Sequence, residues 1–439
     1  MTSMPSLAAE TRSQTRSETR PRMRSLRRVS PLVMPGLAVA ALTLSLPSVA
    51  SAQDRLIGTG VLAVGGTVDA IRFGGVGFQQ PGTMGRDSVR LKQIEQFSVP
   101  VSLALPLGTA WTVDVQSAFT YQRLTYAPKL GAGTTEQTST LYGPTDVRIR
   151  ATGRLFNDAL VFTGGVNAPT GQTELDASAL TVLRATAAPA LGLGAAPVGA
   201  GPSGTAGLVL AKQMLGWAVA IGGSYEMRGK YQPIAAIAAG APSTDFQPGN
   251  VIRGSVGLDR LIGGHRFSVT GAVDLYDDDE LRNPALPSSA PAVSTIRLGP
   301  IFTTDAQIQF AVPRLREFVL WGVNRYRTRY ERDGVEVAGT SGNYFDGGLR
   351  TSIPISATTD ILFTGDGRVH SGLAINQGLA TSGVISGGGT IGLVKRAGAL
   401  TFQPYLRGQG GQLRPRIVGT APRTAFYGAS AGLVIVTRF

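Results

Sequence analysis

Residues 145–171 read TDVRIRATGRLFNDALVFTGGVNAPTG, and this stretch decides between the fold classes open to the chain. In its first half, three arginines including Arg148 fall on one face of an extended chain, whereas Val147 and Ile149 fall on the other. Alternation with a period of two predicts a strand with one polar and one apolar face. Asn157-Asp158 and a second alternating run follow, which predicts a tight hairpin.

A soluble sandwich and a membrane barrel both contain strands with two unlike faces, and the composition favours the barrel. Charged residues make up 16% of the 439 residues, against roughly 25% in typical soluble domains, and 58 residues are glycine. No run of about 20 apolar residues follows the N-terminal region. Low charge, abundant glycine and the lack of a candidate spanning helix in the sequence together predict strands in a membrane.

The residues available for chemistry argue against an enzyme. The chain has no cysteine and only two histidines, His265 and His370, so we expect no disulfide framework, no metal and no cofactor. Outer-membrane hydrolases place Ser, His and acidic groups at a barrel rim, and Asp366, His370 and Ser371 are the candidates here. Neighbouring strand residues point to opposite faces, so His370 and Ser371 cannot pair directly.

Residues 1–52 have the features of an export signal. A basic region is followed by the apolar stretch Leu32–Leu46 and by the small-residue motif Ala50-Ser51-Ala52. We expect cleavage after Ala52, which leaves residues 53–439 as a single barrel domain. An uncleaved membrane anchor is the alternative, and the short apolar stretch speaks against it. Arg27-Arg28 is a weak match to the twin-arginine route, and translation from Met23 stays open.

Sixteen alternating segments account for the rest of the chain. Short and long connections alternate between them, the pattern of an outer-membrane barrel with short periplasmic turns and longer outer loops. We therefore predict an all-β, antiparallel, up-and-down transmembrane barrel of about 16 strands, within a range of 12–18, wide enough for an aqueous channel. The predicted segments are 57–73, 96–106, 110–126, 143–156, 159–169, 204–214, 217–232, 249–262, 265–277, 294–312, 318–331, 343–356, 360–373, 383–396, 399–412 and 427–439.

The last segment reads YGASAGLVIVTRF and ends in Phe439. A terminal Phe that closes an alternating strand resembles the C-terminal signal that barrel-assembly machinery recognises. Some proteins end on an aromatic residue by chance, but here the ending follows an export signal and many alternating segments. We therefore expect Phe439 to be an assembly signal and the outer membrane of a Gram-negative-type bacterium to be the location.

Arginines dominate the predicted inward faces of the strands. A cationic lumen would raise the local concentration of anionic solutes, whereas arginines and acids paired across strands would only brace the wall. Because these arginines are spread over alternating strands rather than gathered in a patch with aromatics, we expect no nucleic-acid partner. The candidate lumen residues are Arg148, Arg150, Arg154, Arg325, Arg327, Arg329, Arg350, Arg368 and Arg407, with Asp114, Asp346 and Asp366 as the acids beside them.

The longest predicted loop, residues 170–203, is unusually apolar and follows the fifth segment. Sixteen-stranded porins fold a loop inward at this position to narrow the pore. Asp176 is placed to cap a short helix that runs through Ala187. One reading is a constriction, with Asp176, Leu180, Leu183 and Arg184 as its residues; the other is a loop that packs over the barrel mouth or is disordered.

Three short runs between Val99 and Gly171 carry a family resemblance: VSLALPLGTAWTVDVQSAFTYQ, GPTDVRIRATGRLF and GGVNAPTG. They are similar to the outer-membrane proteins of the meta-pathway phenol-degradation family, which has the broad character of FadL-type hydrophobic-compound channels. The family pattern of Gly, Asp and Val is matched by Gly143, Asp146 and Val147, and its Pro-Thr-Gly by residues 169–171. The resemblance implies a transporter-like barrel for hydrophobic or aromatic compounds.

The sequence thus predicts a channel for passive uptake of small hydrophobic or aromatic compounds, including anionic ones. The alternatives are a general, weakly anion-selective porin and a structural or adhesive barrel with a blocked lumen. Expected partners are outer-membrane lipids, the barrel-assembly machinery and a small-molecule solute, with a homotrimer open beside a monomer.

Overall fold

The computed structural model describes residues 59–78, 89–128, 135–156, 158–186, 191–194, 198–234, 244–282, 293–372, 383–414 and 424–439. The expected cleavage site after Ala52 lies outside the described residues, as does the side chain of Arg184. Among the described residues, no helix is both long enough and apolar enough to cross a bilayer.

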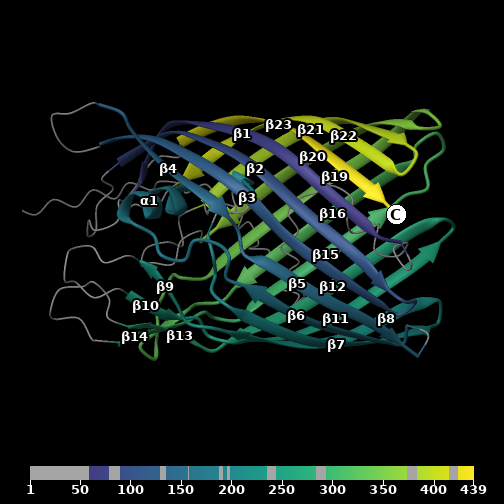
Figure 1. Cartoon of the computed structure of the whole chain (residues 1–439), viewed down its shortest axis with the longest axis horizontal. Helices are drawn as coiled ribbons and strands as arrows, with labels where there is room; N and C mark the ends of the chain where they lie inside the picture. The colour runs from purple at the N-terminus through teal and green to yellow at the C-terminus, as the bar shows by residue number, and fades with distance from the viewer. Residues whose placement is uncertain are drawn as a thin grey trace, which may run out of the picture. The chain divides into compact units, whose positions relative to one another are not determined.

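One closed antiparallel barrel makes up most of the described chain (Figure 1). Each strand pairs with its neighbours in sequence order, and β1 closes the barrel by pairing with β23 along thirteen residues from Val61 to Phe73. Its strand segments are β1 Val61–Phe78, β2 Val89–Leu107, β3 Trp111–Pro128, β4 Gln137–Pro144, β5 Val147–Leu155, β6 Leu160–Ala168, β7 Ser203–Met214, β8 Trp217–Arg228, β11 Val251–Ile262, β12 His265–Tyr276, β15 Ile301–Gln309, β16 Glu317–Arg327, β19 Gly342–Ser356, β20 Thr359–Ser371, β21 Gly383–Ala397, β22 Leu400–Arg414 and β23 Thr424–Arg438.

These 17 segments form 16 barrel strands, as the sequence predicts. Both β4 and β5 pair with β3, β4 along residues 119–126 and β5 along residues 111–116. They are therefore two halves of one strand, interrupted at Thr145 and Asp146.

The strand register separates an apolar outer face from a polar inner face. Val68, Phe97 and Tyr121 are cross-strand neighbours on the outside, and all three are more than one-third exposed. One residue along, Gln96 and Gln122 are neighbours on the inside, and both are fully buried. A soluble sandwich buries its apolar face, so this inverted distribution excludes that alternative and fits a wall that faces lipid.

Tight turns join the strands at the end of the barrel where both described termini lie (Figure 1). The turns at Leu215-Gly216 and Gly263-Gly264 have positive φ at both positions, which matches the twist of a two-residue hairpin. At the other end, the longer connections form a second, six-stranded sheet. It consists of β9 Tyr231–Ile234, β10 Thr244–Gln247, β13 Asp278–Arg282, β14 Val293–Arg297, β17 Glu331–Arg332 and β18 Val335–Glu336.

The predicted segment 294–312 is wrong as a single strand, because it divides into β14 and β15 at Leu298-Gly299-Pro300. Pro300 has no N–H for a sheet ladder, and its carbonyl instead accepts from Thr328 N–H at 3.0 Å. At Gly299 the neighbouring chain comes so close that a side chain would collide with Arg329. The partner strand β16 therefore ends at Arg327, before the predicted boundary at residue 331.

Candidate functional site

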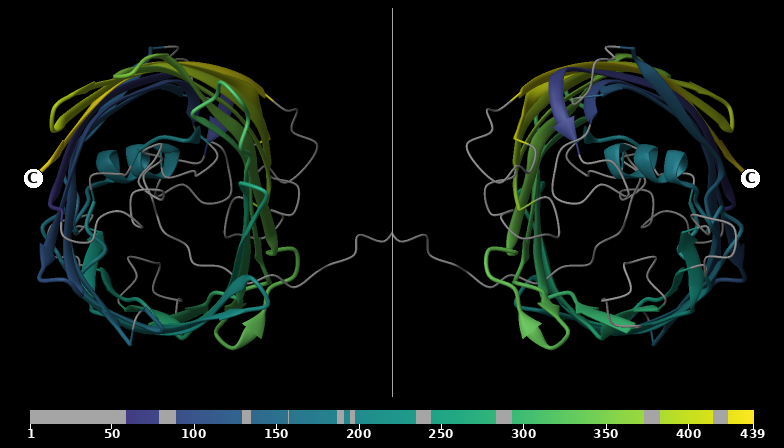
Figure 2. Two further views of the ribbon diagram at one scale, coloured as in Figure 1. Left: turned by 90° about the vertical axis from the view of Figure 1, so that its right-hand side faces the viewer. Right: turned by 90° about the vertical axis from the view of Figure 1, so that its left-hand side faces the viewer.

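The candidate site is the inner wall of the barrel together with the described residues between β6 and β7 that lie against it. We call residues 172–186, 191–194 and 198–200 the insert; it contains α1, Ala177–Thr186, and Figure 2 shows this helix inside the ring of strands. Ala179 N–H donates to Asp176 Oδ1 at 2.7 Å, so Asp176 caps the helix as predicted. Of the two interpretations of this loop, the inward fold describes the position of α1.

An apolar contact holds α1 against the wall. Val182 is fully buried, and Ala179 and Ala185 are nearly so, in one cluster with Leu124 and Leu141 from β3 and β4. The predicted constriction residues Leu180 and Leu183 are partly buried against the same cluster. The helix has its apolar face on the barrel wall because the inner surface of β1 to β4 is itself apolar at this level, with Ile71 and Ile94 fully buried.

Buried amides extend this contact around the wall. Thr186 Oγ1 donates to Gln122 Oε1 at 2.9 Å, and Gln122 Nε2 donates to Gln96 Oε1 at 2.8 Å. Farther along the insert, Gln409 Nε2 of β22 donates to the Leu191 carbonyl at 3.2 Å. In the sequence, the only signal for these glutamines is a position on the polar face of an alternating strand.

A chain of charged side chains lines the inner face from β19 to β22. Arg407 makes a two-point contact with Asp366, with nitrogen–oxygen distances of 2.5 and 2.8 Å. Arg368 lies between two carboxylates, 3.5 Å from Asp346 and 3.9 Å from Asp366. His370 Nε2 is 2.8 Å from Asp346 Oδ1, at the outer-loop end of the same row. The acids and arginines in this row largely offset one another.

Most of the other predicted lumen residues are also paired. Arg150 lies 3.2 Å from Asp114 across β3 and β5, and Arg350 is bound to Glu317. Arg154 is 4.0 Å from Asp158 at the turn end of its strand. These arginines pair with acids across strands or turns, which is the geometry expected if they brace the barrel wall. Arg148 differs from them: it is exposed and stands in register with the neutral Gln116 and Asn167.

The candidate lumen residues Arg325, Arg327 and Arg329 do not form one inward row. Arg329 lies beyond the end of the strand, exposed, with its guanidinium 2.9 Å from Glu336. Arg327 is buried and donates to the carbonyls of Thr340 and Gly372. Arg325 alone faces the lumen, in register with Thr303 and diagonal to the inward Asp305. β16 ends at Arg327, beside the break at Pro300 on the neighbouring strand, so the inward alternation does not continue to Arg329.

The neck of the insert, where it leaves β6 and returns to β7, is gathered around one carboxylate. Asp146, in the break between β4 and β5, is 6% exposed and accepts from Gly171 N–H at 2.9 Å, Ala200 N–H at 2.8 Å and Asn167 Nδ2 at 2.8 Å. In the sequence, Asp146 is part of the family pattern with Gly143 and Val147. In the structure, its carboxylate joins both ends of the insert.

The catalytic candidates are separated as the strand geometry requires. His370 is 3% exposed and points inward, whereas Ser371 is exposed on the opposite face and its hydroxyl donates to the Asn343 carbonyl at 3.4 Å. Within the described part of the chain, no three His, Cys, Asp or Glu side chains are grouped as metal ligands.

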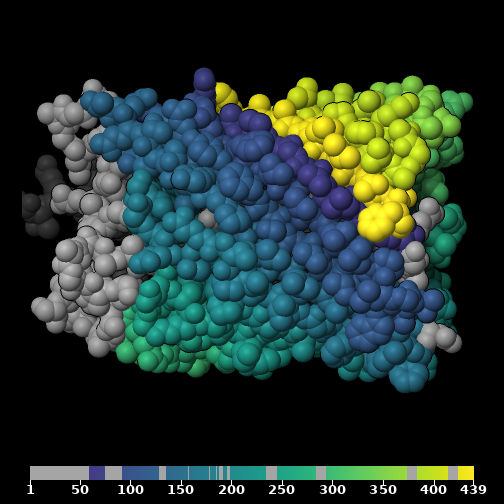
Figure 3. Space-filling model, viewed as in Figure 1, coloured from purple at the N-terminus to yellow at the C-terminus, as the bar shows by residue number. Residues whose placement is uncertain are grey.

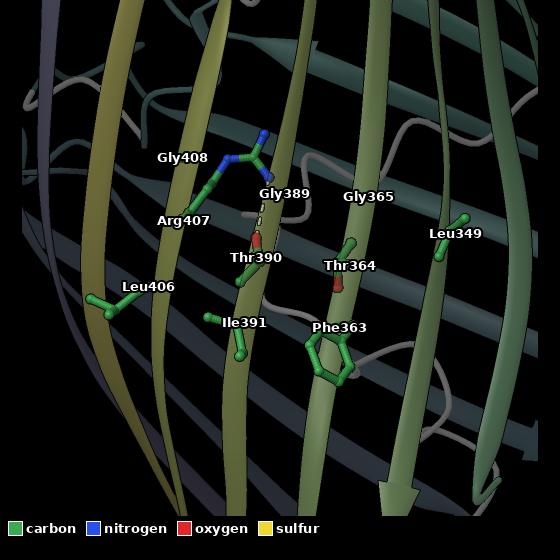
Figure 4. A pocket seen from close by; sticks show the side chains of 10 residues that line it. All are labelled: Leu349, Phe363, Thr364, Gly365, Gly389, Thr390, Ile391, Leu406, Arg407 and Gly408. Carbon is green, nitrogen blue, oxygen red and sulfur yellow. Dashed lines mark hydrogen bonds between the residues drawn. The ribbon is translucent and has the colours of Figure 1, made fainter.

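A separate hollow of about 560 Å³ lies on the outer face of the barrel (Figure 4). Gly365, Gly389 and Gly408 stand side by side in register there, and Leu349, Phe363, Ile391 and Leu406 border them. Space-filling Figure 3 shows the opposite flank of the wall, where β1 to β3 run obliquely beside β23. The hollow faces away from the lumen and is not part of the candidate site.

Phe439 follows β23 and completes the seam of the barrel. Its N–H and carbonyl pair with Gly60 at 3.0 and 2.7 Å, and its ring is 66% exposed. A side chain at Gly60 would collide with this ring, so the ring can occupy its position only because residue 60 is a glycine.

No protein-family model matches the chain, and no curated protein matches it. Solved structures are similar in shape at low sequence identity. OprB of Pseudomonas putida at high pH is 13% identical, with a TM-score of 0.40, over 89% of this chain and 96% of that one. OpdK of Pseudomonas aeruginosa with vanillate is 6% identical, with a TM-score of 0.43, over 87% and 99%. A mutant of TodX, a monoaromatic hydrocarbon channel, is 9% identical, with a TM-score of 0.42, over 87% and 90%. The fold assignment rests on the strand pairing of the chain itself.

Proposed function

We propose that this protein is an outer-membrane channel through which small hydrophobic or aromatic compounds, including anionic ones, enter passively. The observation that carries the proposal is an apolar helix packed inside a closed barrel whose outer face is apolar and exposed. Such an outer face requires lipid around it. Leu180 and Leu183 of the helix are only partly buried, and apolar side chains beside the solute path favour solutes with apolar parts. Export by residues 1–52 and recognition of Phe439 by the assembly machinery belong to the same proposal.

The resemblance to the meta-pathway phenol-degradation family supports the hydrophobic side of this proposal. The residues that carry it, Asp146 with Pro169, Thr170 and Gly171, surround the neck of the insert. The motif is therefore placed where it would hold an element beside the solute path.

Deletion of the insert is the experiment that tests the proposal. Gly199 N–H donates to the Gln172 carbonyl at 2.9 Å, so the ends of residues 173–198 are already close and a short Gly-Ser link can replace them. The purified, refolded mature protein and the deletion variant would be compared in planar bilayers and in liposomes loaded with benzoate, phenol or glucose. We expect higher conductance from the variant and a lower ratio of aromatic to glucose uptake.

A general, weakly anion-selective porin is the second candidate, and the paired lumen charges favour it. Arg150 with Asp114, and Arg407 with Asp366, contribute little net charge to the solute path. Under this alternative the uptake ratio stays the same after deletion of the insert. A cation preference in the reversal potential would contradict both candidates, and a folded barrel without conductance, with or without the insert, would point to a structural role.

A further inference from the structure

We infer that Asp146 is the positioning residue of the channel: its carboxylate fixes the neck of the insert to the barrel wall and so keeps α1 in place against that wall. This inference rests on the proposed function for its consequence, and its structural part is tested separately. The residue belongs to the barrel wall rather than to the insert, and it bonds to the two places where the chain enters and leaves the lumen.

The carboxylate of Asp146 is well suited to this task. Its two oxygens accept three N–H groups, from Gly171, Ala200 and Asn167, and the same Asn167 side chain also donates to the Gly201 carbonyl at 2.9 Å. A buried carboxylate is stabilised only when such donors surround it, and hydrogen bonds to a charged acceptor are stronger than those between neutral groups. The ends of the insert therefore cannot separate without leaving this charge unsatisfied.

Glycines let the two ends of the insert meet at the carboxylate. A Cβ at Gly171 would lie 2.6 Å from the backbone nitrogen of Gly199, and a Cβ at Gly199 would lie 2.8 Å from Asp146 Oδ1. Gly201 has a φ of +78°, in the left-handed region that favours glycine. The neck is thus a backbone-to-backbone crossing packed directly on Asp146.

Two threonines connect the neck to the strands on either side. Thr170 Oγ1 donates to the Thr145 carbonyl and accepts from Val147 N–H, both at 3.0 Å. Thr145 Oγ1 accepts from Ala118 N–H of β3 at 2.9 Å. The interruption between β4 and β5 therefore serves as the attachment point, because it leaves the side chains and backbone groups of residues 145 and 146 available to the insert.

The far end of the insert is held by apolar packing and one hydrogen bond. Leu191 is 1% exposed in the apolar cluster that also contains Val182 of α1, and its carbonyl accepts from Gln409 Nε2 at 3.2 Å. A hydrogen bond of this kind contributes far less than a buried carboxylate with three donors. The neck is therefore the part of the insert that charge-assisted hydrogen bonds hold to the wall, whereas Leu191 is held mainly by packing.

We call the attachment of the neck to Asp146 the clamp. Cysteine accessibility tests the clamp directly, because the native chain contains no cysteine. Ala185 is 4% exposed between α1 and the wall, so Ala185→Cys should react slowly with a maleimide in the folded barrel. In the double variant Ala185→Cys/Asp146→Asn, an amide NH2 group replaces one acceptor oxygen. This group faces the N–H donors of the neck and cannot accept from them. We expect labelling to become roughly tenfold faster or more, and single-channel current to fluctuate between levels.

The matched control is Asp114→Asn, which neutralises another inward carboxylate of the same wall that is paired with Arg150 rather than with the insert. Labelling of Ala185→Cys should not change in that background. Gln409→Ala, which removes only the hydrogen bond to the Leu191 carbonyl, should change the labelling less than Asp146→Asn does.

Each outcome is decisive. Unchanged labelling in the folded Asp146→Asn barrel, judged by its heat-modifiable gel shift, overturns the clamp even if the channel conducts. Faster labelling without conductance in any variant supports the clamp and contradicts the proposed function. If Asp146→Asn does not fold, Asn167→Ala removes one of the three donors and keeps the carboxylate; labelling as slow as in the parent would then overturn the inference.

Discussion

At the scale of single residues, the lumen is organised by pairs rather than by free arginines. Asp366 is nearly buried, and Arg407 and Arg368 both approach it, so each charge in this row depends on its neighbours. Removal of one member leaves a partner in a poorly solvated place without compensation, whereas removal of two opposite charges does not.

Arg407→Gln should therefore destabilise the folded barrel by about 3 kcal/mol, because Asp366 loses its two-point contact. The double variant Arg407→Gln/Asp366→Asn should recover most of that loss. The measurement is the urea midpoint of the refolded protein in detergent micelles. A double variant less stable than the single one would contradict the pairwise account.

Ion selectivity should depend on Arg148 more than on the neighbouring pair. Arg148→Ser removes one exposed positive charge that faces neutral residues, so the preference for anions should fall. The double variant Arg150→Ser/Asp114→Ser removes no net charge and should leave the preference unchanged. Reversal potentials in a salt gradient measure both, and equal shifts in the two variants would refute the argument.

At the scale of elements, α1 is a short helix whose stability comes from its cap and from the wall. Ten residues form a marginal helix in isolation, so the apolar contact with β3 and β4 has to supply most of its stability. The helix ends in Thr186, whose hydroxyl is bound to Gln122 on the wall. Both ends of α1 thus have a specific side-chain contact.

Asp176→Ala should loosen the first turn of α1 by about 1 kcal/mol, since it removes the acceptor for Ala179 N–H. Amide hydrogen exchange over residues 177–186 should become faster, while exchange in β3 stays unchanged. Glu174→Ala, two residues earlier and exposed, is the control and should leave the helix as it is. Faster exchange throughout the barrel would show a structural role beyond the cap.

At the scale of the whole molecule, the barrel depends on a seam that joins the two ends of the described chain. β1 and β23 pair along thirteen residues of β1, and Phe439 adds two backbone hydrogen bonds with Gly60 beyond that ladder. This pairing leaves neither β1 nor β23 as an open edge in the lipid phase. The exposed ring of Phe439 adds little to closure itself.

Phe439→Ala should separate assembly in cells from stability in vitro. The variant keeps both backbone hydrogen bonds with Gly60, so the refolded protein should melt within a few degrees of the parent. If the ring is the assembly signal, the amount of folded barrel in outer-membrane fractions should fall several-fold. Equal loss in both measurements would make Phe439 a structural residue, and no loss in cells would remove its signal role.

The sequence by itself determined the all-β barrel, its number of strands and the faces of their side chains. Alternation is a local property, because each residue of an extended chain points opposite to its neighbour. This alternation predicted that Arg150 and Asp114 point into the barrel. The helix cap at Asp176 was likewise predictable, because it depends only on residues within one helical turn.

Only the tertiary structure decided which charges pair, where the insert lies and where the arginine row ends. Gln409 bonds to Leu191 across 218 positions, and Arg407 meets Asp366 across 41. Arg329 left its predicted row because Pro300, on a different strand, interrupted the ladder beside it. Such outcomes depend on register and packing between distant segments, which local alternation does not encode.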